Sequence, residues 1–279
     1  MHILISNDDG VRAPGIAALA RAMLPFGKVT VVAPSENQSA TGHRKTMHKP
    51  LRIDEVQFPV EGVRAYATSD SPSDSVAVAL LGFVEEPVDL VVSGINRGPN
   101  MGQDLTYSGT VSAAFEAVIW HKPAMAFSLD NFADDADYSA AAAVAQQLVG
   151  MEIYRRLPPL TLFNVNVPNL PLDQIKGFKV VRQGLREYND ELIRRTDPYG
   201  RPYYWIGGAA PTGDTTQEGT DLWALHEGYV SITPIHLDLT NHSLLLDMQR
   251  WGLTKATPGE TRDLPVSEAE HPAAKRNGS

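Results

Sequence analysis

The feature that most constrains the fold of this chain is the alternation of short apolar runs with segments whose apolar residues have helical spacing. Apolar runs at 3–6, 28–33 and 89–93 have the length of buried strands and end at Asn, Pro or Gly. Between them, residues 15–24 and 71–83 carry apolar side chains three and four positions apart, which is typical of helices. Repeated strand–helix–strand units predict a mostly parallel sheet with helices on both faces. We therefore expect a three-layer, Rossmann-like α/β core.

The same alternation continues beyond the central strand. Ser71 and Pro72 are the residues expected at the N-cap and first position of a helix. Further elements are expected as paired strands at 51–57 and 63–68, helices at 111–120 and 138–149, and strands at 124–128 and 161–167.

From about residue 179 the pattern changes to strand-like pieces separated by Gly, Pro, Thr and Asp. These pieces lie at 179–183, 203–206 and 229–233, and a helix is expected at 241–251. The pattern predicts a β-rich hairpin extension near the C-terminus.

The expected domain organisation has three parts. Residues 1–180 form the Rossmann-like catalytic core, and residues 181–252 form the extension, which returns to the core. The segment 253–279 combines prolines and charges with few apolar residues, so we expect a loose or partner-packed tail.

Composition excludes several classes of function. The 279 residues carry a net charge of −9, which argues against a nucleic-acid polymer or an acidic membrane as partner but allows a small phosphorylated substrate. The absence of cysteine excludes disulfides, thiolate nucleophiles and cysteine-based zinc sites. No basic leader precedes an apolar stretch and no apolar run reaches about 18 residues, so we expect a cytoplasmic protein.

Two adjacent carboxylates, Asp8 and Asp9, directly follow the first strand. A turn at Gly10 can direct both toward one cation, which would offset their mutual repulsion. An ordinary turn or helix cap is the alternative. Because ligands of α/β sheets bind beyond the carboxyl ends of strands, we favour a metal or catalytic role.

Two more polar loops follow strands of the same predicted sheet. The loop after the second strand contains Asn37 and Ser39, and Asn96 follows the central strand. Each loop taken alone is more typical of an ordinary solvated turn. Together with Asp8 and Asp9, however, they offer only oxygen donors, which suit one Mg²⁺ or Mn²⁺, with Ca²⁺ as a further alternative.

Ser108, Gly109 and Thr110 precede a predicted helix. The N–H groups and dipole of a helix N-terminus favour anions such as phosphate, although an ordinary Ser or Thr cap is an alternative. The sequence lacks the Gly-Lys-Ser/Thr of a Walker motif.

The isolated histidines and arginines give weaker indications. His43 and His236 are candidate general acids or phosphate contacts, and ordinary surface histidines are the alternative. Arg12 and Arg97 lie in loops at the expected active edge and are candidates for neutralising phosphate, or simply solvated charges.

Several ordered motifs make the chain resemble the SurE (survival protein E) family over roughly residues 1–250. The motifs are Asn7-Asp8-Asp9-Gly10, the loop with Ser39, Ser93-Gly94-Ile95-Asn96 with Gly98 and Asn100, Tyr107-Ser108-Gly109-Thr110-Val111, Gly219-Thr220-Asp221 and Gly228-Tyr229-Val230-Ser231-Ile232-Thr233-Pro234. The resemblance implies a metal-dependent nucleotidase or phosphatase acting on nucleoside monophosphates.

The resemblance also implies a ligand set and an assembly. The divalent cation would fall on Asp8, Asp9, Ser39 and Asn96. The family forms dimers or tetramers through exchanged C-terminal elements, which would give residues 185–206 and the tail a role in homo-oligomer formation. One departure is visible: where the family usually shows Gly-Thr-Pro-Ala-Asp-Cys, this chain has Asp70-Ser71-Pro72-Ser73-Asp74-Ser75.

The expected reaction is hydrolysis of a phosphomonoester by water, with Asp8 and Asp9 holding the cation that activates it. Asp8 or Asp9 as a covalent nucleophile is an alternative. A receiver domain that binds Mg²⁺ and a non-catalytic nucleotide-binding module are non-enzymatic alternatives. A receiver needs only about 120 residues and a phosphorylatable Asp after its third strand, whereas the central strand here ends at Asn96.

Overall fold

The computed structural model of the protein describes residues 1–251. The chain divides into two compact units, residues 1–237 and residues 238–279, which are described separately. The expected tail at 253–279 lies outside the described residues, and the expected division into a core, an extension and a tail stays a prediction.

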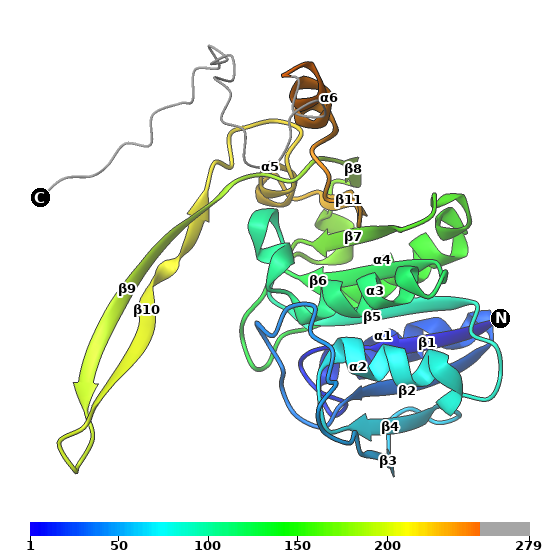
Figure 1. Ribbon diagram of the computed structural model, residues 1–279. Coiled ribbons are helices and arrows are strands. Elements are labelled where there is room, and N and C mark those ends of the chain that lie inside the picture. The colour runs from blue at the N-terminus through cyan, green and yellow to red at the C-terminus, as the bar shows by residue number, and fades with distance from the viewer. Residues whose placement is uncertain (252–279) are drawn as a thin grey trace, which may run out of the picture. The chain divides into compact units, whose positions relative to one another are not determined.

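A nine-stranded sheet organises the first unit (Figure 1). In spatial order its strands are β3 (Ile53–Val56), β4 (Arg64–Thr68), β2 (Lys28–Pro34), β1 (His2–Ser6), β5 (Leu90–Arg97), β6 (Ala124–Leu129), β7 (Thr161–Val167), β11 (Val230–His236) and β8 (Phe178–Val180). The six strands from β4 to β7 are parallel to one another, whereas β3 and β11 run antiparallel to their neighbours β4 and β7.

Helices cover both faces of this sheet. Helices α1 (Pro14–Met23) and α4 (Ser139–Gly150) pack together on one face, and α2 (Pro72–Val78) and α3 (Gly109–Ile119) pack together on the other (Figure 1). Side chains of β1 alternate between these layers, with Ile3 and Ile5 in one core and Leu4 in the other. The predicted three-layer α/β architecture is confirmed.

Helix α2 begins as the sequence predicts and ends earlier. Ser71 caps it, with its side chain accepting from the Asp74 N–H in a capping box. The helix ends at Val78, and a π turn over Ala79–Phe83 follows, in which Gly82 has a φ of 117°. This left-handed conformation is accessible to glycine and stops the regular helix.

The C-terminal extension contains a long antiparallel hairpin, which confirms the β-hairpin part of the predicted fold. It consists of β9 (Arg186–Thr196) and β10 (Pro202–Gly213) (Figure 1). The sequence located only residues 203–206 of it. Strand β9 lacks an apolar–polar alternation because nearly all its side chains are exposed, so no buried face marks it as a strand.

Other predicted elements of this region differ in extent. The strand expected at 179–183 is limited to β8, which pairs with β11. A short helix, α5 (Asp221–His226), was not expected. In the second unit, α6 (His242–Arg250) matches the expected helix. Within residues 1–251, no helix has the length and apolar character needed to cross a bilayer.

The contact between α1 and β5 makes Gly15 sensitive to substitution. A Cβ at Gly15 would lie 2.1 Å from the Ile95 carbonyl oxygen, which is backbone. We expect Gly15→Ala to lower the free energy of unfolding by about 1–3 kcal/mol through overpacking. Gly150→Ala is the matched control, since its Cβ would meet Phe26 at an ordinary 3.5 Å. Urea denaturation of both variants measures the difference, and equal stabilities would contradict the packing argument.

Candidate active site

The carboxyl ends of three neighbouring parallel strands lie side by side where the strand order changes direction in the sheet. Strand β1 lies between β2 and β5, so the loops that follow these strands share one edge. Asp8 and Ser39 lie in the loops after β1 and β2, and Asn96 lies near the carboxyl end of β5 itself. Open α/β sheets bind ligands at this switch point.

A pocket of about 620 Å³ opens at this edge. Asp8, Asp9, Ser39 and Asn96 all line it, together with Ser108 at the start of α3. Side chains from four segments that are remote in sequence therefore share one cavity, as the strand-end argument requires.

Asp8 is the buried member of the carboxylate pair. Its Oδ1 atom accepts a hydrogen bond from the Thr110 hydroxyl, and a Cβ at Gly109 would lie 2.9 Å from its Oδ2 atom. Burial raises the pKa of Asp8 to about 6, and the neighbouring Asp9 charge adds to the effect, whereas the Thr110 hydrogen bond opposes it. Asp8 is therefore a carboxylate whose charge the protein itself compensates poorly.

Asp9 is more accessible and is held through both oxygens. Its Oδ2 atom accepts from the Arg97 backbone N–H at 3.0 Å, and its Oδ1 atom accepts from the Asn37 amide at 3.4 Å. Burial raises the pKa of Asp9, and the Arg97 backbone hydrogen bond opposes that shift. These two contacts connect the loop after β1 to the loop after β2 and to the last residue of β5.

The loop carrying Ser39 is attached directly to the carboxylate pair. The Gln38 N–H donates to the Asp8 carbonyl oxygen at 2.7 Å, and the Ser39 N–H donates to the Asn37 side chain at 2.8 Å. The Ser39 side chain is exposed at the pocket wall. Ser39 therefore lies at the cavity wall on a backbone held by hydrogen bonds.

Asn96 reaches the site through an irregularity in β5. The register with β6 shifts between Ser93 and Asn96, which interrupts the regular ladder. The Asn96 amide nitrogen donates to the Gly98 carbonyl oxygen at 2.7 Å. Because the nitrogen is occupied, the Oδ1 atom is the group that Asn96 offers to a ligand.

The donor set fits a hard divalent cation. The pocket combines two carboxylates, a hydroxyl and an amide oxygen, without a soft nitrogen or sulfur ligand among these four. Residues 1–251 hold no group of three or more His, Cys, Asp and Glu side chains able to bind a metal. The carboxylate pair with its two neutral oxygen donors is therefore the arrangement in the described chain that best suits Mg²⁺ or Mn²⁺, with Ca²⁺ as the larger alternative.

The predicted anion site at α3 is more specialised than the sequence suggests. Ser108 is the N-cap, and its hydroxyl oxygen accepts from the Val111 N–H at 3.1 Å. Thr110 is fully buried and donates to Asp8, so its hydroxyl positions the carboxylate. The first N–H groups of the helix, including that of Gly109, lack partners within the helix and are the groups left for an anion.

Six predicted residues are absent from the pocket lining. Asn37, Gly109 and Thr110 lie directly against the carboxylate pair. The other three are His43, His236 and Arg12. The His43 ring contacts Glu116 at 2.9 Å. His236 pairs with Thr161 at the start of β7, which is the opposite edge of the sheet, because β11 runs antiparallel to β7. Arg12 is exposed outside the lining. Arg97, by contrast, lines the pocket and contacts Asp134.

The pocket also contains residues that sequence reasoning missed. Asp104, Phe132, Asp134, Arg186 and Pro211 come from four further segments. Arg186 Nε donates to the Asp104 carboxylate at 2.8 Å, which joins the base of the hairpin to the short 3₁₀ helix Gly102–Thr106. No local motif marks these positions, because their proximity depends on how the hairpin meets the sheet edge.

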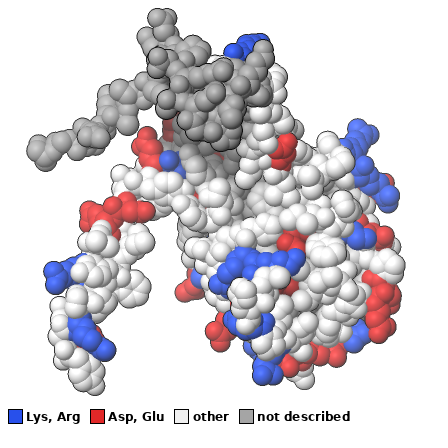
Figure 2. Space-filling view, in the orientation of Figure 1, with Lys and Arg blue, Asp and Glu red and all other residues white. Residues whose placement is uncertain are grey.

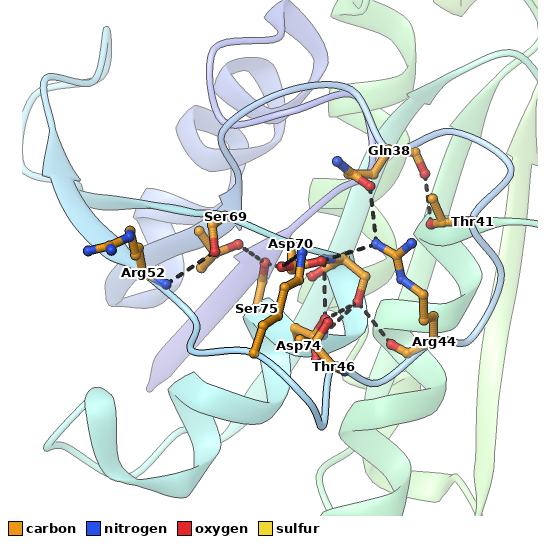
Figure 3. Close-up of polar contacts among 12 residues, drawn as sticks. Gln38, Thr41, Arg44, Thr46, Arg52, Ser69, Asp70, Asp74 and Ser75 are labelled. Atoms are coloured by element: carbon orange, nitrogen blue, oxygen red, sulfur yellow. Dashed lines mark hydrogen bonds and ion pairs between the residues drawn. The ribbon is translucent and has the colours of Figure 1, made fainter.

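A basic segment, residues 43–49, continues from the Ser39 loop and is bound to three buried acids. Figure 3 shows Arg44 and Thr46 reaching Asp70 and Asp74. Arg44 lies 3.3 Å and Lys49 2.7 Å from the Asp70 carboxylate. The Thr46 N–H and hydroxyl each donate to Asp74 at 2.8 Å. These contacts connect the Ser39 loop to the start of α2.

The third acid, Glu116 on α3, binds the other end of the basic segment. His43 and Lys45 contact its two oxygens at 2.9 and 3.2 Å, and the Trp120 ring N–H donates to it at 2.8 Å. Burial tends to raise the pKa of Glu116, but these three donors outweigh it and lower the pKa to about 2. Glu116 is therefore a charged anchor at neutral pH.

The departure at residues 70–75 now has a structural account. The helix start survives, because the Ser71–Asp74 capping box is present. Asp70 stands where the family usually has glycine, and its buried carboxylate is compensated by Arg44 and Lys49. In this chain Asp70 thus forms an ionic contact with the basic segment.

The fold and the site together define an open α/β protein with a carboxylate-rich, hard-cation site at the switch point of a parallel sheet. The profile of the family Survival protein SurE matches residues 3–190. The chain is 46% identical over 258 residues to the 5'-nucleotidase SurE of Geobacter sulfurreducens, covering 92% of this chain and 96% of that one. It therefore belongs to the SurE family.

Two further relatives agree with this assignment. The 5'-nucleotidase SurE of Herpetosiphon aurantiacus is 48% identical over 242 residues, covering 86% of this chain and 94% of that protein. The crystal structure of SurE protein from Aquifex aeolicus matches with a TM-score of 0.74 and 40% identity, covering 90% of this chain and 99% of that one.

Neutralising Glu116 is expected to loosen the basic segment. Glu116→Gln keeps an acceptor for Trp120 but removes the charge that His43 and Lys45 contact. We expect a loss of about 1–3 kcal/mol of stability and a severalfold faster tryptic cleavage after Arg44 and Lys45. Glu85→Gln, at an exposed position, is the control. Unchanged cleavage in Glu116→Gln would show that this anchor does not hold the segment.

Neutralising Asp8 is expected to stabilise the metal-free protein. Its pKa rises from 3.8 to about 6 on folding, so between these pH values the unfolded chain releases a proton that the folded chain keeps, and stability falls as pH rises. With a chelator present, Asp8→Asn should therefore be more stable than wild type at pH 7, by on the order of 2–3 kcal/mol, and lose this advantage near pH 4.

Thermal unfolding at pH 4 and pH 7 measures this difference. Asp173→Asn, at an exposed position, is the control and should show no such pH-dependent gain. An Asp8→Asn variant that is less stable than wild type at pH 7 in chelator would contradict the interpretation.

Proposed function

We propose that the protein hydrolyses nucleoside monophosphates to nucleoside and inorganic phosphate in a divalent-cation-dependent reaction. The observation that carries the proposal is the convergence of Asp8, Asp9, Ser39 and Asn96 on one pocket beside the N-terminus of α3. A cation site next to an anion site is what hydrolysis of a phosphomonoester needs. The relatives named 5'-nucleotidase SurE, similar over nine-tenths of the chain, support the same activity.

One set of residues would bind the cation, and another would bind the phosphate. Asp8, Asp9, Ser39 and Asn96 would hold one Mg²⁺ or Mn²⁺, or else Ca²⁺. When bound, the cation neutralises phosphate charge and acidifies a water molecule. Asp8 and Asp9 are catalytic in this sense, and Thr110 positions Asp8.

Phosphate would be bound beside the cation site, at the N-terminus of α3. Ser108 and the first N–H groups of α3, at Gly109 and Thr110, would receive its oxygens, with Asn37 near Asp9 as a further donor. Water attacks phosphorus, the ester P–O bond breaks, and the leaving nucleoside oxygen takes up a proton. We favour water over aspartate as nucleophile, because both Asp9 oxygens and Asp8 Oδ1 already accept hydrogen bonds that hold them as ligands.

The non-enzymatic alternatives receive less support. A receiver domain would place a phosphorylatable aspartate after the third parallel strand, whereas β5 here delivers Asn96 to the site. A purely nucleotide-binding module would not need a second carboxylate beside Asp8, because the negative charges of Asp8 and Asp9 repel each other.

The hairpin supports a proposal of homodimers or homotetramers. Strand β10 exposes Tyr204, Trp205 and Ile206 to solvent in succession, and β9 exposes Leu192. Exposed apolar side chains of this density are typical of interfaces. On the face shown in Figure 2, the core carries basic and acidic side chains interspersed, which supports a small substrate over a nucleic-acid polymer. The expected cytoplasmic location stays a prediction.

Release of phosphate from AMP tests the proposed function. We expect turnover with Mn²⁺ or Mg²⁺, its loss on chelation, and a decrease of at least about a hundredfold in Asp9→Asn, which removes one charge from the cation site. Asp173→Asn, an exposed position, is the control and should keep full activity. A phospho-aspartate trapped during turnover would contradict water as the nucleophile. Absence of phosphate release with every divalent cation would contradict the proposed nucleotidase activity.

A further inference from the structure

The pocket has an aromatic part that phosphate hydrolysis alone does not require. Tyr107 and Phe132 line it, yet their side chains are 59% and 72% exposed. Single exposed apolar residues are common on protein surfaces. Two aromatic rings at the wall of the cavity that also holds the carboxylate pair are a more specific arrangement. We call Tyr107 and Phe132 the aromatic pair.

Phe132 is held close to the cation ligands by a glycine. A Cβ at Gly98 would lie 2.2 Å from Phe132 Cε1, so the ring lies directly against the Gly98 backbone. The same backbone accepts the Asn96 amide at 2.7 Å. In addition, Asp134, two residues after Phe132, contacts Arg97. The ring is therefore placed beside Asn96 although most of its surface is open.

Tyr107 is fixed from the other side, through its backbone. The N–H groups of Tyr107 and Ser108 both donate to the Asp104 carbonyl oxygen at 3.0 Å. The Asp104 carboxylate accepts from Arg186 at 2.8 Å and from the Tyr188 hydroxyl at 2.7 Å, which ties this turn to the base of the hairpin. Tyr107 thus directly precedes the phosphate-binding end of α3 and has an ordered backbone with an exposed ring.

We propose that the aromatic pair is the nucleobase subsite of this enzyme, an inference that rests on the proposed nucleotidase function. A base presents a flat face that stacks on aromatic rings whatever its hydrogen-bonding edge. Asp104 and Arg186, which also line the pocket, offer polar groups to the sugar. The subsite therefore selects phosphomonoesters that carry a base and discriminates weakly among bases.

A pair of substrates that differ only in the base tests this subsite. AMP and ribose 5-phosphate present the same phosphate and sugar. We expect Phe132→Ala and Tyr107→Ala each to lower kcat/KM for AMP about tenfold, mainly through KM, and to change kcat/KM for ribose 5-phosphate by less than about twofold. Adenosine should inhibit wild type competitively and each alanine variant about tenfold more weakly.

Two further variants control the experiment. Phe132→Tyr keeps a stacking ring and should retain AMP turnover. Phe178→Ala removes an exposed phenylalanine outside the pocket lining and should affect neither substrate. Equal losses for AMP and ribose 5-phosphate, or no loss for either, would overturn the subsite while leaving the nucleotidase intact. Failure of wild type to release phosphate from both substrates would instead overturn the proposed function.

Discussion

The burial of the Asp8 carboxylate at the edge of the sheet is the constraint on which the rest of the site depends. Folding places this acid beside Asp9 with the Thr110 hydroxyl as its side-chain hydrogen-bond donor, and its pKa rises accordingly. A buried acid with so little compensation costs stability unless a cation binds nearby. The site is thus organised around a charge that the polypeptide does not neutralise by itself.

Charged contacts beside and within the pocket wall hold the loops around it. The basic segment forms ion pairs with Asp70 and Glu116 and hydrogen bonds with Asp74, and it follows directly from the loop that carries Ser39. On the other side of the pocket, Arg186 and Asp104 join the hairpin to the turn before α3. The ligand loops are therefore held by the ion pairs of the basic segment outside the pocket and by the Arg186–Asp104 pair in its wall.

Sequence reasoning reached the centre of the site and missed its periphery. Asp8, Ser39 and Asn96 were predictable because each lies at or soon after the carboxyl end of a strand, and parallel strands bring these ends to one edge. Phe132 and Arg186 were not, because nothing in their local sequence records the loop and hairpin geometry that brings them to the pocket. His236 shows the reverse error: its strand was predicted, but the antiparallel direction of β11 carries it to the opposite edge.

The sequence by itself determined the alternating elements of the core, since their buried faces leave a periodic apolar pattern. It also determined the chemistry of the candidate cation ligands, because oxygen donors at strand ends suit a hard ion. Only the tertiary structure decided the length of the exposed hairpin, which buries no face, and the pairing of Glu116 with His43 and Lys45. These features depend on contacts between residues far apart in the chain, and local periodicity carries no record of such contacts.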